Sequence, residues 1–527
     1  MSLLTTPVRA AGLPDVASES RRERVLRRPA VLVGVVVALG VGLRLWSFSA
    51  LWLDESQTVA FARMPLSDLP DALRTDGAPP LYYVLLHFWM QVFGHGVWAI
   101  RSMSMLASIA ALPLSWRVTR RLGGSRELAA VVLLLLSSSP WAIRYSGEAR
   151  MYSLVFLEVL LGVLALERLR RLDDTASLLA VGALTAALLY THYWTLFLVV
   201  NAAAFLLVVA WRRPMERRFV TRALTAGACG ALAYLPWVPS MLWQSRHTAA
   251  PWADTPDLGT LAELPIDWFG GTGPAGMCAG LLVSPLLFVA VFGRRTSSGA
   301  LLFSGRPALR SGLLAALLVA TLLTGLTSAV VSGSAVAIRY TAVVVPVFIL
   351  LLAIGVTRLP RQAGHAALAV LVAIGLSGGL TAATTPHTQA DQVADVLNKH
   401  AGYGDLIVYC PDQLAPSIEA RLDVVGVNRV ELPAEKNPAV VDWTDYMSRL
   451  SDFNPQNTAR SIVSYLKTQF DASVWFINGW GYRTHVSVCG PLRDRLVAML
   501  GAPTLMHDGL DRGYEKSVLE RFSPPKR

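Results

Sequence analysis

Long apolar runs separated by short polar connections dominate the sequence before residue 384. An α-helix needs about 20 apolar residues to cross a bilayer, and slightly fewer where neighbouring helices shield it. The runs therefore predict about eleven membrane-spanning helices. These are expected at residues 29–50, 99–117, 127–144, 152–168, 176–191, 194–211, 223–243, 273–292, 311–332, 340–357 and 366–383.

The polar connections alternate between two kinds. One kind is rich in arginine and comprises residues 117–126, 167–171, 212–222, 294–310 and 358–361. The other kind is poor in lysine and arginine and comprises residues 51–96, 146–151, 191–193, 245–273 and 332–337. Because basic loops stay in the cytoplasm, the pattern predicts that the second kind faces the outside of a plasma membrane. Residues 1–28 then form a cytoplasmic tail, and an odd number of spans leaves the C-terminal region outside.

The first external loop, residues 51–98, is long enough to hold elements of its own. Residues Phe61 to Leu73 have helical apolar spacing and are expected to lie along the membrane surface. Pro79 and Pro80 precede the aromatic-rich residues Leu81 to Phe93, which predict a helix in the membrane interface. A full span here is the alternative and would make the count twelve, but it would reverse every later loop against the charge pattern.

Charged residues return from about residue 385, and residues 385–527 read as alternating helices and strands. This alternation predicts an extracytoplasmic α/β domain with a parallel sheet. Helices are expected at residues 392–400, 414–421, 458–470 and 491–500, and strands at residues 405–410, 429–432 and 473–478. Cys410 and Cys489 both fall in this domain, either as a disulfide or as two buried free thiols.

The composition excludes an ordinary soluble domain. Of the 527 residues, 53% are hydrophobic and only 16% are charged, and the mean hydropathy is +0.46. Such values are typical of a polytopic membrane protein. The net charge of +11 comes from arginine clusters between the apolar runs. It therefore indicates membrane orientation and not a nucleic-acid partner.

Several polar residues share the external side in this topology. Ionisable residues at the edge of a membrane span are costly, so they commonly mark function. Their clustering on one side predicts a single site. The candidates are Asp54, Glu55, Asp76, Glu148, Arg150, His192 and Arg339.

At these positions the sequence resembles the polyprenyl-phosphate-sugar-dependent glycosyltransferases of the GT-C superfamily. The resemblance is to the family 39-like group, which includes protein O-mannosyltransferases and lipid A aminoarabinose transferases. It covers about the first 380 residues and leaves out the C-terminal domain. It rests on Trp52-Leu53-Asp54-Glu55, Asp76-Gly77-Ala78-Pro79-Pro80-Leu81-Tyr82-Tyr83, Glu148-Ala149-Arg150-Met151-Tyr152, Thr191-His192-Tyr193 and Arg339-Tyr340.

The resemblance implies a GT-C catalytic domain at residues 29–384 and a sugar donor carried on a polyprenyl monophosphate. It implies that Asp54 is the catalytic base and that Glu55 orients a substrate. The remaining expected substrate-binding residues are Asp76, Glu148, Arg150, Tyr152, His192, Arg339 and Tyr340. The family commonly has a histidine directly before the double proline, where this chain has Ala78. The function of that histidine is therefore absent from this chain or is supplied by His87 or His192.

The expected chemistry suits these residue types. An acceptor hydroxyl loses its proton as it attacks the anomeric carbon, and a carboxylate can accept that proton. A single displacement inverts the sugar, by analogy with inverting glycoside hydrolysis. The leaving phosphate needs cations, which Arg339 and Arg150 could supply. No cofactor is required, although Asp54, Glu55, Glu148 and His192 could hold a divalent cation.

The donor sugar is expected to be mannose, with arabinofuranose as the alternative, and the acceptor an envelope glycan, lipid or protein. Structural roles remain open for single residues. Glu148 and Arg150 could form a local ion pair, and Arg339 could only anchor a helix end. A transporter or flippase for a lipid-linked glycan is the alternative function. It would need polar residues through to both membrane faces, and the cytoplasmic halves of the predicted spans carry none.

Overall fold

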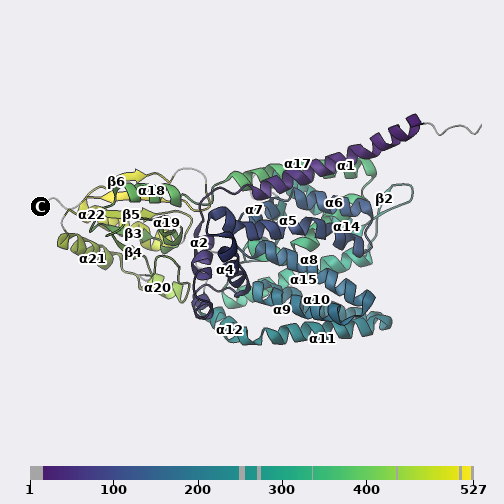
Figure 1. The fold of residues 1–527 in the computed structure, drawn as a ribbon, viewed down its shortest axis with the longest axis horizontal. Helices are drawn as coiled ribbons and strands as arrows, with labels where there is room; N and C mark the ends of the chain where they lie inside the picture. The colour runs from purple at the N-terminus through teal and green to yellow at the C-terminus, as the bar shows by residue number, and fades with distance from the viewer. Residues whose placement is uncertain are drawn as a thin grey trace, which may run out of the picture.

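The structure is a computed structural model that describes residues 16–248, 256–269, 274–334, 336–434, 437–469, 471–482, 484–509 and 513–523. Figure 1 shows a long helical body with a smaller α/β domain at one end. Helices α2, α4 and α12 lie at the end that carries this domain, and helix α1 extends beyond the body at the opposite end. This arrangement brings the predicted external loops to the end that carries the α/β domain.

Each predicted span contains helix in the structure, and three of them are broken into shorter pieces. Span 127–144 is divided into α6 and α7, span 223–243 into α11, η3 and α12, and span 340–357 into η4 and α16. The helices are α1 (Val16–Leu45), α5 (Val97–Arg121), α6 (Arg126–Ser137), α7 (Pro140–Ser146), α8 (Tyr152–Leu172), α9 (Thr175–Thr191), α10 (Trp194–Arg212), α11 (Arg217–Ala233), η3 (Leu235–Trp237), α12 (Val238–His247), α14 (Pro274–Phe292), α15 (Leu309–Ser332), η4 (Ile338–Val343), α16 (Val345–Arg358) and α17 (Arg361–Thr384).

Length and composition support fewer membrane crossings than the sequence predicts. Among the described residues, four helices are long and apolar enough to cross a membrane, namely α5, α10, α15 and α17. The pair α6 and α7, bent by 54°, makes a fifth if it is counted as one span. Helices α9, α14 and α16 are apolar but shorter. The chain is thus a polytopic helical membrane protein, with the number of crossings left as a prediction.

Arg44 explains how the break between α6 and α7 is tolerated. Its guanidinium donates hydrogen bonds to the carbonyls of Leu136 at 2.7 Å and Ser137 at 2.9 Å, at the end of α6. The Leu136 carbonyl also accepts from the Ser139 amide at 3.3 Å, whereas the Ser137 carbonyl has no partner within the helix, and leaving it unpaired in an apolar interior would cost free energy. Gly40 allows the close approach, because a Cβ there would collide with the carbonyl of Ser137. The only charge in the first apolar run is therefore structural.

The first external loop differs in part from its prediction. The expected helix at residues 61–73 is instead α2 (Leu53–Ala62), α3 (Leu69–Ala72) and η1 (Leu73–Thr75). Pro65 follows the end of α2, where proline cannot continue the helix. Helix α4 (Leu81–Phe93) lies where it was predicted, and its 13 residues are fewer than a span needs. Helices α2 and α4 of this loop thus lie next to the C-terminal domain (Figure 1).

Some elements of the membrane body had no counterpart in the sequence pattern. They are η2 (Pro214–Glu216), α13 (Leu258–Phe269) and a two-stranded hairpin of β1 (Gly293–Arg295) and β2 (Leu301–Phe303). The hairpin lies in a connection that is rich in arginine and serine, where two three-residue strands give no periodic signal.

The C-terminal domain has a mixed sheet, which corrects the predicted parallel one. Its strand order is β4-β3-β5-β7-β6. Strands β4 (Asn428–Glu431), β3 (Leu406–Cys410) and β5 (Val474–Asn478) are parallel, as predicted, but β7 (Val518–Phe522) and β6 (Thr504–His507) are antiparallel and were not predicted. The helices of the domain are α18 (Ala390–His400), η5 (Asp412–Leu414), α19 (Ala415–Glu419), α20 (Tyr446–Asp452), α21 (Pro455–Thr468), the π-helix η6 (His485–Cys489) and α22 (Gly490–Leu500).

A disulfide joins Cys410 and Cys489, which decides between the two sequence-based alternatives. It links the end of β3 to the π-helix η6 that precedes α22. Trp475 is fully buried and donates to Asp405 Oδ2 at 2.8 Å, so it belongs to the core of the domain. Disulfides persist in oxidising compartments.

Candidate functional site

Asp54 lies in the first turn of α2 between two arginines from distant parts of the chain. Its Oδ2 atom is 3.8 Å from Arg150 Nη2 and 3.7 Å from Arg339 Nη2. Only 13% of the side chain is exposed, and Oδ2 accepts no hydrogen bond within the described part of the chain. A buried carboxylate oxygen that faces two cations without a hydrogen bond is able to accept a proton from a substrate.

Arg150 is fixed from several sides. It donates to Thr58 Oγ1 at 2.8 Å and to the Tyr83 hydroxyl at 3.3 Å, and its Nη1 lies 3.9 Å from Asp76 Oδ2. Asp76 in turn accepts hydrogen bonds from Gln57 at 2.7 Å and from Tyr83. Burial raises the pKa of Asp76, although the charge of Arg150 opposes this shift. The guanidinium thus sits between the carboxylates of Asp54 and Asp76 in a fixed position.

Aromatic rings form the wall opposite these charges. The His192 ring centre lies 6.0 Å from that of Tyr152 and 5.4 Å from that of Tyr340, and the Arg339 guanidinium is 5.6 Å from the Tyr340 ring. Burial, followed by the charges of Arg150 and Arg339, lowers the pKa of His192 to about 3. His192 is therefore neutral at physiological pH and acts as a hydrogen-bonding ring rather than a cation.

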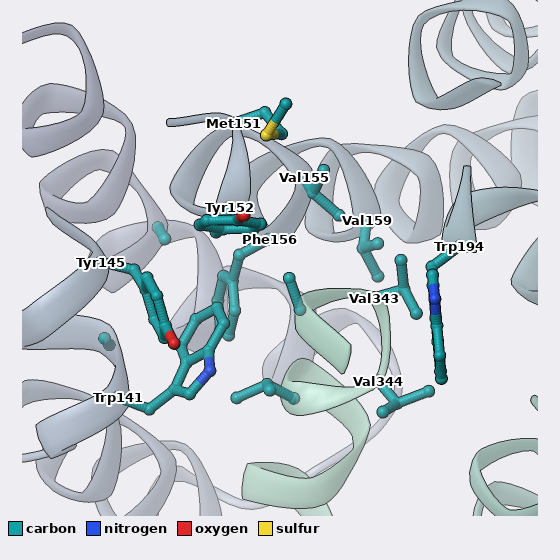
Figure 2. Close-up of a cluster of buried hydrophobic side chains, with 14 of the residues drawn as sticks. Trp141, Tyr145, Met151, Tyr152, Val155, Phe156, Val159, Trp194, Val343 and Val344 are labelled. Atoms are coloured by element: carbon teal, nitrogen blue, oxygen red, sulfur yellow. The ribbon is translucent and has the colours of Figure 1, made fainter. Parts of the chain in front are cut away.

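Packing beneath the site holds Tyr152 in place. Figure 2 shows Tyr152 and Phe156 of α8 beside Trp141 and Tyr145 of α7. The ring centres of Tyr145 and Tyr152 are 5.1 Å apart, at the T-shaped angle that aromatic pairs favour. This apolar layer orders the start of α8, and thereby the loop that carries Arg150.

A cavity of about 360 Å³ opens at the site. Asp76, Arg150, Tyr152, His192 and Tyr340 form its polar end. Its other end runs between α10 and α15 and is mostly apolar: Trp194, Leu196, Phe197, Gly325 and Ala329 line it, together with Ser328 and Ser332. The cavity therefore suits a molecule with a polar head and an apolar chain. Ala78, which stands where the family commonly has histidine, also lines it.

Four of the candidates do not line this cavity: Asp54, which lies beside Arg150, Arg339, which lies beside Asp54, and Glu55 and Glu148, which have structural partners. Glu55 is fully buried and receives hydrogen bonds from Arg101 Nε at 2.7 Å and from the Ala149 amide at 2.8 Å. Burial alone would raise the pKa of Glu55, but the charge and hydrogen bonds of Arg101 lower it to about 2. Glu148 is also buried and accepts from Arg144 Nε at 3.3 Å. Glu55 joins α2 to α5 and to the loop that holds Ala149, and Glu148 joins that loop to α7. Neither residue lines the cavity.

His87 is also placed away from the cavity. Its Nδ1 atom lies 2.8 Å from the carbonyl of Ala62, and its Nε2 atom lies 2.8 Å from Gln91. Of the two histidines considered as substitutes at Ala78, only His192 reaches the cavity.

The C-terminal domain contributes to the site, which sequence reasoning missed. Glu515 is buried, and its Oε1 atom accepts a hydrogen bond at 2.9 Å from the amide of Leu53, the residue before Asp54. Burial raises the pKa of Glu515 to about 7, and Asp54 adds to this shift. The pKa of Tyr482, also in this domain, is raised first by burial and then by the charges of Glu515 and Asp54. No periodic pattern marks these residues, because they lie in loops.

Arg101 is a further residue that sequence reasoning missed. It belongs to α5, is fully buried, and also donates to the carbonyl of Ala50 at 2.9 Å. The signal that could have revealed it is an arginine at the start of a predicted span with acids in the preceding loop. Among the described residues, no group of three His, Cys, Asp or Glu side chains is arranged to hold a metal ion.

Comparison with known proteins places this geometry in a structural class. Residues 77–243 match the model of the family described as dolichyl-phosphate-mannose-protein mannosyltransferase. The apo structure of ArnT from Cupriavidus metallidurans is similar, with a TM-score of 0.56 over 94% of this chain and 98% of that chain, at 13% identity. The chain has the GT-C fold. The GT-C match extends into the C-terminal domain, which the sequence resemblance had left out.

Two further solved structures are similar to the chain. ArnT from Cupriavidus metallidurans bound to undecaprenyl phosphate matches with a TM-score of 0.51 and 13% identity, over 93% of this chain and 97% of that chain. An oligosaccharyltransferase from Archaeoglobus fulgidus matches with a TM-score of 0.49 and 11% identity, over 94% of this chain and 76% of that chain. No curated protein sequence matches the chain.

Proposed function

We propose that this chain is a membrane glycosyltransferase that transfers a sugar from a polyprenyl monophosphate to an acceptor hydroxyl. The observation that carries the proposal is the placement of Asp54 between Arg150 and Arg339 beside a cavity with one polar and one apolar end. A base and two cations are the groups that this reaction needs. The GT-C fold and the matched mannosyltransferase model support it.

The proposed reaction is a single displacement. The acceptor oxygen forms a bond to the anomeric carbon while the bond from that carbon to the phosphate oxygen breaks, which inverts the anomeric centre. Asp54 takes the hydroxyl proton. The leaving phosphate keeps the bonding electron pair, and its growing negative charge is stabilised by Arg339 and Arg150.

Access to Asp54 requires local movement. The Oδ2 atom is shielded from solvent, and the cavity reaches Arg150 but not Asp54. The side chains around Asp54 therefore have to move as the acceptor binds, and their return would exclude water from the reacting centre. Catalytic contacts often tighten only in the substrate complex.

The donor occupies the cavity with its phosphate near Arg150 and its isoprenoid chain along α10 and α15. The bound undecaprenyl phosphate in the ArnT structure supports a lipid monophosphate as the carrier. Tyr152, His192 and Tyr340 provide ring faces and hydrogen-bonding atoms beside the sugar. We propose mannose as the sugar because of the matched family description. Arabinofuranose is the alternative, and the acceptor is an envelope glycan, lipid or protein.

The reaction is proposed to take place at the outer face of the plasma membrane. The scarcity of lysine and arginine in the loops at this end and the disulfide Cys410–Cys489 both support that side. The N-terminal tail would then lie in the cytoplasm and the C-terminal domain outside. We propose that Glu55 keeps α2 in place through Arg101 rather than touching substrate, and that no metal ion takes part.

The test replaces Asp54 by asparagine. The Asp54→Asn chain, purified and folded, is expected to lose sugar transfer by about a hundredfold to ten-thousandfold, because an amide cannot accept the proton. The assay supplies radiolabelled polyprenyl-phosphate mannose and polyprenyl-phosphate arabinose in parallel, with and without a chelator. Asp71→Asn, in the same loop but exposed, is the matched control. If the Asp54→Asn chain transferred sugar at most of the native rate, Asp54 would not be the base.

A further inference from the structure

A second large cavity lies at the end of the body opposite the C-terminal domain. Helix α8 starts at Tyr152 in the site and ends at Leu172, so its far end is about 30 Å away at 1.5 Å per residue. The cavity there has a volume of about 1070 Å³ and lies between the ends of α5, α8, α10 and α16 and the start of α15. It is larger than the cavity at the candidate site.

An adjoining cavity extends this space sideways. Its volume is about 590 Å³, and it shares Arg170, Arg213, Arg310 and Phe205 with the larger cavity. The sideways extension is lined mainly by apolar side chains of α8, α10 and α11. These include Val163, Leu166, Leu206, Val209 and Phe219. The two cavities thus form one space with a wide mouth and an apolar arm.

The mouth has an excess of positive charge. Five arginines line it, and two glutamates oppose them; the arginines are Arg121, Arg170, Arg171, Arg213 and Arg310. Glu216 pairs with Arg170 at 3.0 Å, and Glu167 pairs with Arg171 at 3.3 Å. Arg213 and Arg310 make no ion pair with any residue that the structure describes. Two guanidinium groups are therefore available to an anion at the mouth.

We infer that this space binds an anionic phospholipid, with its phosphate at Arg213 and Arg310 and its acyl chains along the apolar arm. Arginine forms paired hydrogen bonds with phosphate oxygens, and basic recesses between membrane helices bind anionic headgroups. A small soluble anion would leave the apolar arm unfilled. The site is a helix length away from Asp54, so the inference does not depend on the proposed function.

The experiment measures lipid binding by the full chain purified in neutral detergent. Phosphatidylglycerol and phosphatidylcholine are titrated separately and followed by native mass spectrometry and by the melting temperature. Phosphatidylglycerol is expected to bind saturably, at least about tenfold more tightly than phosphatidylcholine, and to raise the melting temperature. The double variant Arg213→Gln/Arg310→Gln should lose most of that preference. Equal binding of the two lipids by the native chain would overturn the inference.

Three further variants separate this site from general surface charge. Arg306→Gln removes an exposed arginine close in sequence to Arg310 that does not line the cavity, and it should bind like the native chain. Arg213→Lys/Arg310→Lys keeps the charge and should retain most of the binding. Leu313→Trp fills the space shared by the two cavities and should weaken binding with all arginines in place.

These variants distinguish a specific lipid site from attraction by surface charge. A loss in Arg306→Gln as large as in the double glutamine variant would show that only surface charge attracts the lipid. Displacement of phosphatidylglycerol by an equimolar amount of a polyprenyl phosphate would identify an isoprenoid lipid as the occupant, and the phospholipid inference would fall.

Discussion

The two ends of the membrane body carry the same kind of ion pair in opposite surroundings. At the end with the C-terminal domain, Arg101 and Glu55 meet at 2.5 Å and neither side chain is exposed. At the other end, Arg168 and Asp174 meet at 3.0 Å with 55% and 36% of their side chains exposed. The distances are similar, so burial decides what each pair contributes. Charges interact weakly in water and strongly where water is excluded.

The C-terminal domain accounts for much of this difference. It covers one end of the body, and its residues Trp443 and Val441 donate backbone hydrogen bonds to Thr75 at 3.0 Å and to Gln57 at 3.1 Å. Excluding water fixes the charged groups of the candidate site in one arrangement before a substrate arrives. The opposite end stays open, and there the same residue types form solvated pairs and a recess. The preorganisation of these charged groups thus depends on the C-terminal domain that covers them and not on the charged residues alone.

Removing one member of the buried pair should give the largest change. Arg101→Met leaves the carboxylate of Glu55 buried without its main partner, which costs about 3–5 kcal/mol of stability. The melting temperature of the purified chain in detergent measures this loss. Arg74→Met, which breaks an exposed pair with Asp71, is the control and should change little. The double variant Glu55→Gln/Arg101→Met should recover part of the loss, and a further fall would contradict this account.

Glu515 should make stability depend on pH at the covered end. The pKa of Glu515 is about 7 in the folded chain and has its ordinary value of 4.5 in the unfolded chain. Between pH 4.5 and pH 7, therefore, the Glu515 carboxyl is protonated in the folded state and ionised in the unfolded state. The unfolded state binds fewer protons, so the stability that Glu515 contributes falls as pH rises through about 4.5 to 7. Glu515→Gln can still accept from the Leu53 amide but cannot ionise.

The glutamine variant should therefore melt close to the native chain at pH 4 and above it at pH 8. The difference in unfolding free energy at pH 8 should reach about 3 kcal/mol at most. Glu127→Gln, an exposed acid of α6 at the other end, serves as the control and should show no such trend. A native chain that gained stability relative to the glutamine variant with rising pH would reverse the assignment.

Arg339 should affect the donor more than the fold. Arg339→Ala removes a cation from the side of Asp54, and the loss of a charge-assisted contact to phosphate is worth about 2 kcal/mol. The KM for the polyprenyl-phosphate donor should rise about tenfold or more. Arg339→Lys, which keeps the charge, should recover part of the affinity. Unchanged donor kinetics in the alanine variant would place the phosphate elsewhere.

The smallest effect is expected at the open end. Arg168→Ala breaks an exposed ion pair, while Asp174 still accepts from the Ser177 amide at 2.7 Å and so still caps α9. The change in stability should stay below about 1 kcal/mol and shrink further at high salt. Melting temperatures at low and high salt measure it. A loss comparable to that of Arg101→Met would mean that burial is not what separates the two ends.

The sequence was sufficient to predict the elements that have a long periodic signal. The apolar runs located the long helices of the body, but not η2 or α13, and the polar residues in the connections poor in lysine and arginine pointed to the site. Asp54, Asp76, Arg150, Tyr152, His192, Arg339 and Tyr340 do come together in space. The loop pattern pointed to the charged residues and His192, because membrane insertion sorts polar residues by side. Tyr152 and Tyr340 were expected only from the resemblance to the glycosyltransferases.

Features that depend on tertiary contacts could not be predicted in this way. The bend between α6 and α7 depends on Arg44, which lies some ninety residues earlier in the chain. The antiparallel strand β7 depends on pairing with β5 across a long connection. Glu515 and Arg101 act through partners far away in sequence. Such partners leave no local pattern, because their spacing is set by the fold.

The hydrogen bond from the Leu53 amide to Glu515 spans 462 positions of the chain. Ribosomes deliver residue 53 to the membrane long before residue 515 exists, and chain segments begin to fold in that order. The Leu53 amide at the start of α2 therefore has no Glu515 partner until the C-terminal domain has been synthesised and has folded against the body. The start of α2 thus takes its final arrangement only after residue 515 has been added and the C-terminal domain has folded against it.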